Sequence, residues 1–152
     1  DLCEWLARFL AGFCQSRNLD ETPFDYQPLE ASPRVMADPD QLQQILENLC
    51  DNALKYGSPE RSQIVVRAVR HLPDMKPCIE VIDHGPGISS KLTEQIFEPF
   101  YTSSPTGTGL GLYIARELAE LNQARLSYTP SETGGSCFCL CLRDAEEATI
   151  EL

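Results

Sequence analysis

Apolar positions in the first third of the chain predict two amphipathic helices. In residues 2–14, leucine, tryptophan and phenylalanine recur every three or four positions, so one stripe of a helix is apolar. A second helix is expected from Asp38 to about Tyr56. Asp38 is a good N-cap, Pro39 suits the first helical position, and Gln41 would complete a capping box. The buried face of this helix would carry Leu42, Ile45, Leu46, Leu49 and Ala53.

Alternating and β-branched residues predict strands, with one further helix among them. The strands are expected at about residues 24–26, 34–37, 62–71, 77–83, 124–129 and 136–142. The helix would span Leu110–Leu121, with Leu110, Ile114, Leu118 and Leu121 on one side. Because these elements are mixed without strict β–α–β alternation, they predict an α+β fold, built as a two-layer α/β sandwich.

Size and charge restrict what the chain can be. Its 152 residues are enough for one domain, and a net charge of −11 argues against binding to nucleic acid. No apolar run approaches the ~20 residues of a membrane span, and no signal peptide is present. Since the chain starts at Asp1 rather than Met, we expect a fragment of a longer protein, without membrane contact of its own. We also expect this fragment to be a monomer.

Seven cysteines are scattered through apolar runs, which predicts reduced, buried thiols rather than a disulfide framework. Cys137, Cys139 and Cys141 alternate, so on a strand they would line one face. Three thiolates can indicate zinc. However, zinc sites usually space cysteines around a turn, and no fourth ligand is near in the sequence. We therefore expect a core strand here rather than a metal site.

Polar residues recur along one stripe of the second predicted helix. Asn48 and Asn52 are one turn apart, and Lys55 and Tyr56 follow a turn later, beside the leucine-rich face. An asparagine oxygen is a good ligand for Mg²⁺, and a lysine one turn on can meet a phosphate. Solvated helix residues would give the same pattern, so this motif alone is not specific.

A turn with a single carboxylate follows the strand predicted at 77–83. In Asp83-His84-Gly85-Pro86-Gly87, the carboxylate could accept a hydrogen bond from an exocyclic amine such as adenine N6. The glycines let the backbone pass close to a flat ligand. An ordinary Gly-Pro-Gly turn explains the same residues.

Two further motifs follow in the chain. Phe97-Glu98-Pro99-Phe100-Tyr101 sets aromatics around a proline, which usually anchor a loop to the core. Gly107-Thr108-Gly109-Leu110-Gly111-Leu112 opens the third helix, where N–H groups and the positive end of the helix dipole suit phosphate. It is not a dinucleotide fingerprint, because Leu112 stands where the last glycine is needed. Nor is it a Walker A loop, because no Gly-Lys-Ser/Thr occurs.

Taken in this order, the motifs resemble the N, G1, F and G2 boxes of the catalytic and ATP-binding domain of sensor histidine kinases. This is the Bergerat-fold family shared with gyrase B, Hsp90 and MutL, and the resemblance covers about residues 24–143. It implies a mixed, mostly antiparallel sheet with helices on one face. It also implies the end of a dimerisation or linker helix (1–17), a catalytic and ATP-binding domain (18–143) and an acidic tail (144–152), which we expect to be loose.

The resemblance also implies roles for individual residues. Asn52 would ligate Mg²⁺, with Asn48 and Lys55 at the ATP phosphates, and these three are the predicted catalytic residues. Tyr56 would flank the adenine, and Asp83 would accept a hydrogen bond from adenine N6. The rest of the implied ATP site consists of Gly85, Gly87, Ile88, Thr102, Ser103, Gly107, Thr108, Gly109, Leu110, Gly111 and Leu112.

One position separates the kinases from the ATPases of this family. Gyrase-like ATPases resemble Glu-x-x-x-Asn, in which the glutamate activates water, whereas this chain has Asn48 there. An amide cannot act as a general base, so ATP would be kept for another nucleophile. Glu47 lies ~100° away around the helix and is not expected to substitute.

The resemblance further implies a phosphoacceptor histidine on a dimerising helical hairpin, which passes the phosphate to a response regulator. Neither His71 nor His84 fits the family's acceptor motif, so the acceptor domain would be separate. The ATP-binding domain in this chain would then be the cytoplasmic part of an inner-membrane protein.

The segment between Phe100 and Gly107 is short, as in the nitrogen-regulation branch, with Ser104 where a lysine is usual. The runs Asn48–Tyr56 and Glu117–Tyr128 are also similar to sensor kinases that control type IV pilus expression. The alternatives are a serine protein kinase of the anti-sigma-factor type, which has the same fold, and a non-enzymatic nucleotide sensor.

Overall fold

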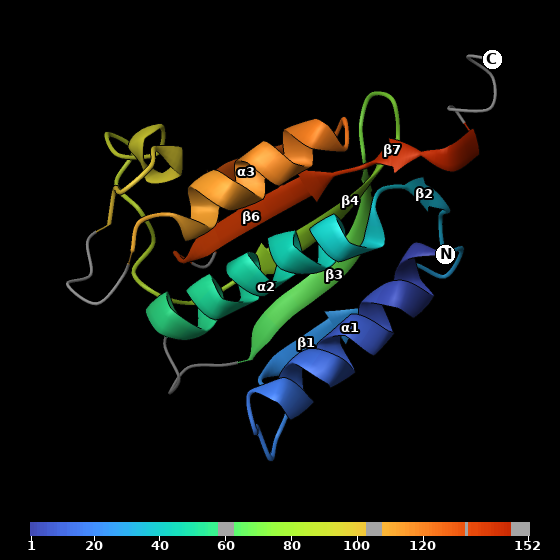
Figure 1. The fold of residues 1–152 in the computed structure, drawn as a ribbon, viewed down its shortest axis with the longest axis horizontal. Coiled ribbons are helices and arrows are strands. Elements are labelled where there is room, and N and C mark those ends of the chain that lie inside the picture. Colours follow the sequence, from blue (N-terminus) through green and yellow to red (C-terminus); the bar gives the residue numbers. More distant parts are fainter. Residues whose placement is uncertain (58–62, 103–107, 133, 147–152) are drawn as a thin grey trace.

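A five-stranded sheet backs three helices in the computed structural model, which describes residues 1–57, 63–102, 108–132 and 134–146 (Figure 1). The sheet runs in the order β1 (Phe24–Gln27), β3 (Ile64–His71), β4 (Lys76–Ile82), β6 (Ser136–Cys141) and β5 (Arg125–Pro130). Only the β1–β3 pair is parallel among these strands. The predicted mixed, mostly antiparallel sheet is therefore confirmed.

The helices α1 (Leu2–Ser16), α2 (Pro39–Tyr56) and α3 (Gly111–Leu121) lie over one face of this sheet (Figure 1). The alternation along the strands sends residues such as Val66, Ile79, Val81 and Leu140 into the core that the sheet shares with the helices. A single turn of 3₁₀ helix, η1 (Gln95–Phe97), lies in the loop between β4 and α3. No helix in the described ranges has the length and hydrophobicity needed to cross a membrane.

The first helix packs into the same core as the rest of the chain. Leu2 and Leu6 are fully buried, and Phe13 contacts the Phe24 ring of β1 edge-on at 5.6 Å. The Tyr26 hydroxyl donates to the Cys3 carbonyl at 2.7 Å. We had expected residues 1–17 to be the end of a dimerisation or linker helix. In the structure the apolar residues of α1 belong to the same core cluster as those of the sheet and α2.

The start of α2 differs from its prediction in one detail. Asp38 caps the helix by accepting from the N–H groups of Asp40 and Gln41, and Pro39 is the first helical residue, as predicted. The capping box was wrong, because Gln41 does not return to the Asp38 N–H. Instead Asn122, at the end of α3, accepts from the Asp38 N–H at 2.8 Å and donates to the Gln41 side chain at 2.7 Å.

The buried stripe of α3 also differs from the leucine-rich side that periodicity indicates. Its buried residues are Ala115 and Ala119, whereas Leu118 is half-buried and Leu121 is 71% exposed. Small side chains let α3 approach its neighbours closely, so its larger apolar residues lie at the margin of the contact rather than its centre.

Two expectations at the C-terminal end of the chain were wrong. Asp144 does not begin a loose tail, because it lies in β7 (Arg143–Asp144), which pairs with β2 (Val35–Met36), and it is buried beside Arg70 at 3.2 Å. The cysteines are not all free thiols, because Cys78 and Cys141 face each other across β4 and β6 and are joined by a disulfide.

Candidate nucleotide site

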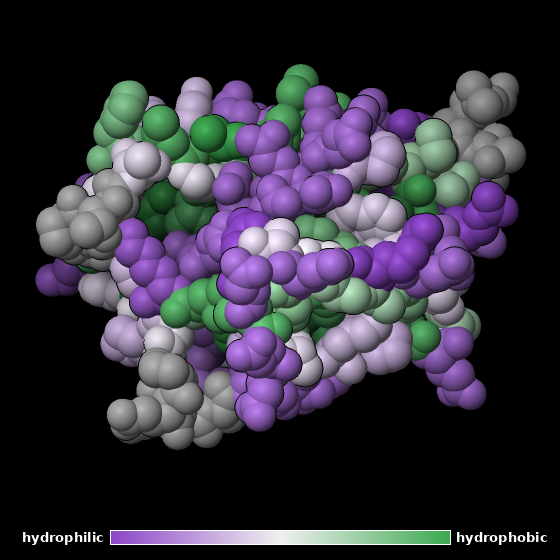
Figure 2. Space-filling view, turned by 60° about the horizontal axis from the view of Figure 1, so that its bottom comes forward, coloured by the Kyte–Doolittle hydropathy of each residue, from purple (hydrophilic) through white to green (hydrophobic). Residues whose placement is uncertain are grey.

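A cavity of about 440 Å³ opens between the C-terminal half of α2, the loop after β4 and the start of α3. In Figure 2 the surface is hollowed at the left of the molecule, with apolar atoms at the floor of the hollow and hydrophilic atoms to its right and below it. This volume falls within the range of small-molecule sites. Residues that the sequence singled out make up most of its wall: Asn48, Asn52, Lys55, Tyr56, Asp83, Gly87, Ile88, Thr102, Thr108, Gly109, Gly111 and Leu112.

Several residues that the sequence predicted for the site are not among those that line the cavity. Gly85 and Leu110 do not line the cavity, and Ser103 and Gly107 lie outside the described residues. The structure adds residues that the sequence did not single out for ligand binding: Asp51, Pro86, Ser89, Leu92, Ile96, Tyr101 and Ser136. Asp51, Pro86 and Tyr101 stand inside recognised motifs. The others reach the cavity through tertiary packing, so no local pattern marks them.

On the α2 side of the cavity, the Nδ2 amide of Asn48 is buried and has no hydrogen-bond partner among the described residues. Leaving such a donor unpaired costs about 1–3 kcal/mol. Gly111, at the start of α3, lies beside it, because an added Cβ there would come to 4.0 Å from Asn48 Cγ. A small acceptor, such as a phosphate oxygen, would satisfy the amide in the space that a larger residue at 111 would take up.

On the opposite side, the Asp83 carboxylate is fixed by the backbone. It is only 3% exposed, and its Oδ1 accepts from the Gly85 N–H at 2.9 Å and the Ser136 N–H at 3.4 Å. The neighbouring strand holds the segment as well, because the Asp83 N–H donates to the Ser136 carbonyl at 3.0 Å. Since Oδ1 is committed to the backbone, Oδ2 is the oxygen left to meet a ligand in the cavity.

Gly85 acts on the site through its size rather than by contact. A Cβ at residue 85 would lie 2.1 Å from the Tyr56 carbonyl oxygen, so only glycine lets this loop pass the end of α2 so closely. Gly87 has φ of +75°, in the left-handed region that favours glycine. The turn after β4 is thereby pressed against the last residue of α2.

The aromatic motif anchors one side of its loop only. Phe97 is buried and contacts Phe138 edge-on at 6.3 Å. Phe100 was expected to be a second anchor, but its side chain is 74% exposed. Its backbone makes the contact instead, since the Phe100 N–H donates to the Gly109 carbonyl at 2.8 Å. This bond draws the two ends of the 100–109 segment together beside the cavity.

With this geometry established, comparison with known proteins gives the family. Residues 37–146 match the family described as histidine kinase-, DNA gyrase B- and HSP90-like ATPase, which is most of the chain.

The chain belongs to this family.

Its curated relatives are sensor kinases. The sensor protein kinase PilS of Pseudomonas aeruginosa is 41% identical over 140 residues, 91% of this chain and 26% of PilS. The histidine kinase/phosphatase NtrB of Klebsiella oxytoca is 36% identical over 115 residues, 69% of this chain and 32% of NtrB. The chain thus spans about a quarter to a third of the length of these relatives. It is homologous to the ATP-binding domains of sensor histidine kinases, and the anti-sigma-factor type is not favoured.

Solved structures agree on the fold. The catalytic domain of the histidine kinase ThkA has a TM-score of 0.74 and 26% identity, with 91% of this chain and 92% of ThkA's covered. Full-length ShkA in complex with AMPPNP has a TM-score of 0.76 and 24% identity, over 95% of this chain and 31% of ShkA.

Within this histidine kinase-like fold, Glu47 lies away from the cavity. Its carboxylate accepts from Gln43 at 3.2 Å, and it lines a separate depression together with residues of α1. Asp51 also lines the cavity, but its carboxylate is held by Arg17 at 2.8 Å. The expectation that Glu47 does not replace the missing base therefore fits its position.

Proposed function

We propose that this domain binds MgATP and transfers the γ-phosphate to a histidine on a separate dimerisation domain of a sensor histidine kinase. The observation that carries the proposal is the buried Nδ2 of Asn48, which has no hydrogen-bond partner in the described part of the chain and belongs to a residue that lines the cavity beside Gly111. A response regulator would receive the phosphate from the histidine. The domain would act as a monomer on the cytoplasmic side of an inner-membrane protein.

Residues on the two sides of the cavity would bind different parts of ATP. Asp83 Oδ2 would accept from adenine N6, with Tyr56 beside the base. At the other end, the Asn48 amide, Lys55, Thr108 and the backbone at the start of α3 would hold phosphate oxygens.

Mg²⁺ fits the donor set on α2. The amide oxygens of Asn52 and Asn48 are the kind of hard ligand it prefers, and the ion supplies charge neutralisation at the phosphates when bound. Since neither amide can take a proton from water, these residues position ATP without activating its hydrolysis. The nucleophile would then come from another domain.

Isothermal titration calorimetry of Asn48→Ala and Asn52→Ala with MgATP tests the site. We expect Kd to rise at least about tenfold in each, since about 1.4 kcal/mol or more of binding is lost. Asn48→Ala should remain as stable to urea as the wild type, because it removes a buried donor that has no partner in the described part of the chain. Gln43→Ala, exposed on the same helix, is the matched control. Unchanged affinity in both asparagine variants would refute this site.

A second experiment tests the chemistry. With radiolabelled ATP, we expect no acid-labile label on this chain alone, and label on the dimerisation domain when that domain is supplied. Acid-stable label on a serine substrate would instead support the anti-sigma-factor type of kinase. Steady release of inorganic phosphate by the isolated chain would show that water is activated after all.

A further inference from the structure

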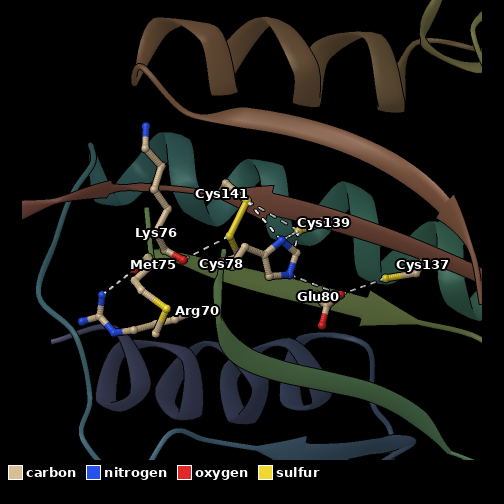
Figure 3. Close-up of a disulfide and its surroundings, with 9 residues drawn as sticks. Arg70, Met75, Lys76, Cys78, Glu80, Cys137, Cys139 and Cys141 are labelled. Carbon is tan, nitrogen blue, oxygen red and sulfur yellow. Dashed lines mark hydrogen bonds and ion pairs between the residues drawn. A yellow bond between two sulfur atoms is a disulfide. The ribbon is translucent and has the colours of Figure 1, made fainter. Parts of the chain in front are cut away.

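Four potential metal ligands meet on the sheet, well away from the nucleotide cavity. The side-chain ligand atoms of His71, Cys78, Cys139 and Cys141 all lie within 4.8 Å of one another. Cys78 and Cys139 are buried, and His71 and Cys141 are half-buried. Figure 3 shows the three cysteines gathered where β4 and β6 run side by side.

Strand register brings these residues together. Cys78 is opposite Cys141 and Glu80 is opposite Cys139, so alternate residues of β4 and β6 share one face. Ile79, between them, points into the core under the helices. The cluster therefore occupies the other face of the sheet, and His71 joins it from the end of β3.

The distances suit a tetrahedral ion. The Sγ atoms of Cys139 and Cys141 are 3.7 Å apart, and His71 Nδ1 lies 3.9 Å from the first and 4.0 Å from the second. Tetrahedral Zn²⁺ with its usual bond lengths sets S···S at about 3.8 Å and S···N at about 3.6 Å. Cys139, Cys141 and His71 thus stand within a few tenths of an ångström of a zinc geometry, whereas the Cys78 sulfur would have to separate from that of Cys141 on reduction.

The surroundings of His71 strengthen this assignment. Its Nε2 faces a Glu80 oxygen at 3.7 Å, and the other Glu80 oxygen accepts from Arg67 at 2.7 Å. Metal-binding histidines typically donate their second ring N–H to a carboxylate, which fixes the tautomer and frees the other nitrogen for the ion. Nε2 also lies 3.9 Å from the Cys139 sulfur, but Nδ1 is the nitrogen within 4.0 Å of both Cys139 and Cys141, so it is the one we assign to the ion.

We propose that His71, Cys78, Cys139 and Cys141 form a binding site for a thiophilic divalent cation, best matched by Zn²⁺, when Cys78 and Cys141 are thiols. The disulfide between those two cysteines closes the site. A dithiol opens it by giving two electrons and two protons to the Cys78–Cys141 bond and becoming a cyclic disulfide itself. The ion then binds the thiolates, and the thiol protons pass to solvent.

The cation site and the nucleotide site can be tested separately. Cys78 lies near the start of β4 and Asp83 directly follows its end, five residues or about 17 Å further along the chain. Loss of cation binding should therefore leave MgATP affinity unchanged, so failure of this proposal and failure of the ATP site are distinguishable.

The experiment titrates Co²⁺, then Zn²⁺, into chain freed of metal with a chelator and reduced with a phosphine. We expect one equivalent of Co²⁺ with thiolate charge-transfer and tetrahedral d–d bands, displaced by Zn²⁺. Cys139→Ser and His71→Ala should each weaken binding at least tenfold. Cys137→Ser is the matched control, because Cys137 lies on the same strand and face but its sulfur contacts Glu80 instead.

His71 is half-exposed at the end of its strand, so His71→Ala tests the site even if Cys139→Ser impairs folding. Wild-type chain with the disulfide intact should bind no Co²⁺ with a thiolate spectrum. The proposal is overturned if reduced wild type shows no such spectrum, or if Cys137→Ser weakens binding as much as Cys139→Ser. It is also overturned if the oxidised chain binds equally well.

Discussion

Two backbone N–H groups, those of Gly85 and Ser136, donate to one oxygen of Asp83, and this arrangement decides what the residue can do for a ligand. A carboxylate buried at 3% exposure needs such partners, because a buried charge without hydrogen bonds is costly. They also orient it, so that Oδ1 serves the fold and Oδ2 is left to serve the ligand. At the scale of single residues, the structural and binding roles of Asp83 thus divide between its two oxygens.

Asp83→Asn tests this division. The asparagine Oδ1 can keep both backbone bonds, so the fold should persist, but Nδ2 would present a donor to the adenine amine. We expect ATP affinity to fall about 10- to 100-fold, because a hydrogen bond would be replaced by two donors, the side-chain amide and the adenine amine, that face each other. Inosine triphosphate, which has an acceptor at that position, should lose less. Calorimetry with both nucleotides is the measurement, and an unchanged ATP-to-inosine triphosphate ratio would contradict the role given to Oδ2.

At the scale of elements, the site depends on how closely the turn after β4 approaches the end of α2. The backbone of Gly85 lies against the Tyr56 carbonyl. In the same way the backbone of Gly135 lies against the Asp83 carbonyl, where a Cβ added to Gly135 would come to 2.0 Å from the carbonyl oxygen. Glycines at these positions let the helix and two strand ends converge on the cavity. Binding chemistry is therefore set by backbone packing as well as by the side chains that line the wall.

Gly85→Ala should destabilise the fold by about 1–3 kcal/mol, because the added Cβ would overlap the Tyr56 carbonyl and force the turn away from α2. ATP binding should weaken with it. Gly12→Ala is the matched control, since nothing lies within 4 Å of that Cβ and the residue is exposed within α1. There we expect a gain of about 0.5–1 kcal/mol from helix propensity. Urea denaturation of both variants checks the opposite signs.

At the scale of the whole molecule, α1 contributes apolar residues to the core that the sheet and the other helices share. Its apolar stripe is buried against β1 and α2, and Arg17 at its end pairs with Asp51 of α2. That ion pair is partly exposed, so packing rather than charge accounts for most of its attachment. We therefore propose that the stability of the nucleotide domain depends on its first helix.

Leu6→Ala should lower the free energy of unfolding by about 2–5 kcal/mol, because Leu6 is fully buried in the shared core. Arg8→Ala, exposed on the same helix, should change it by less than about 0.5 kcal/mol. Both are measured by urea denaturation with a single cooperative transition. If Leu6→Ala were as mild as Arg8→Ala, α1 would be a peripheral linker and the domain would start after it.

By itself, the sequence determined those features that depend on interactions between residues close together in the chain. The cap at Asp38, the apolar stripe of α2 and the alternation of β3 follow from hydrogen bonds and periodicities a few residues long, so they could be predicted. The order of the motifs indicated the nucleotide cavity, and most of its wall lies where those motifs stand. Only the tertiary structure decided the contacts made by residues far apart in the chain. Asn122 completes the cap of α2, and Cys78 and His71 join Cys139 and Cys141 through strand register. Such pairings depend on which strands and helices become neighbours, and no short stretch of sequence carries that information.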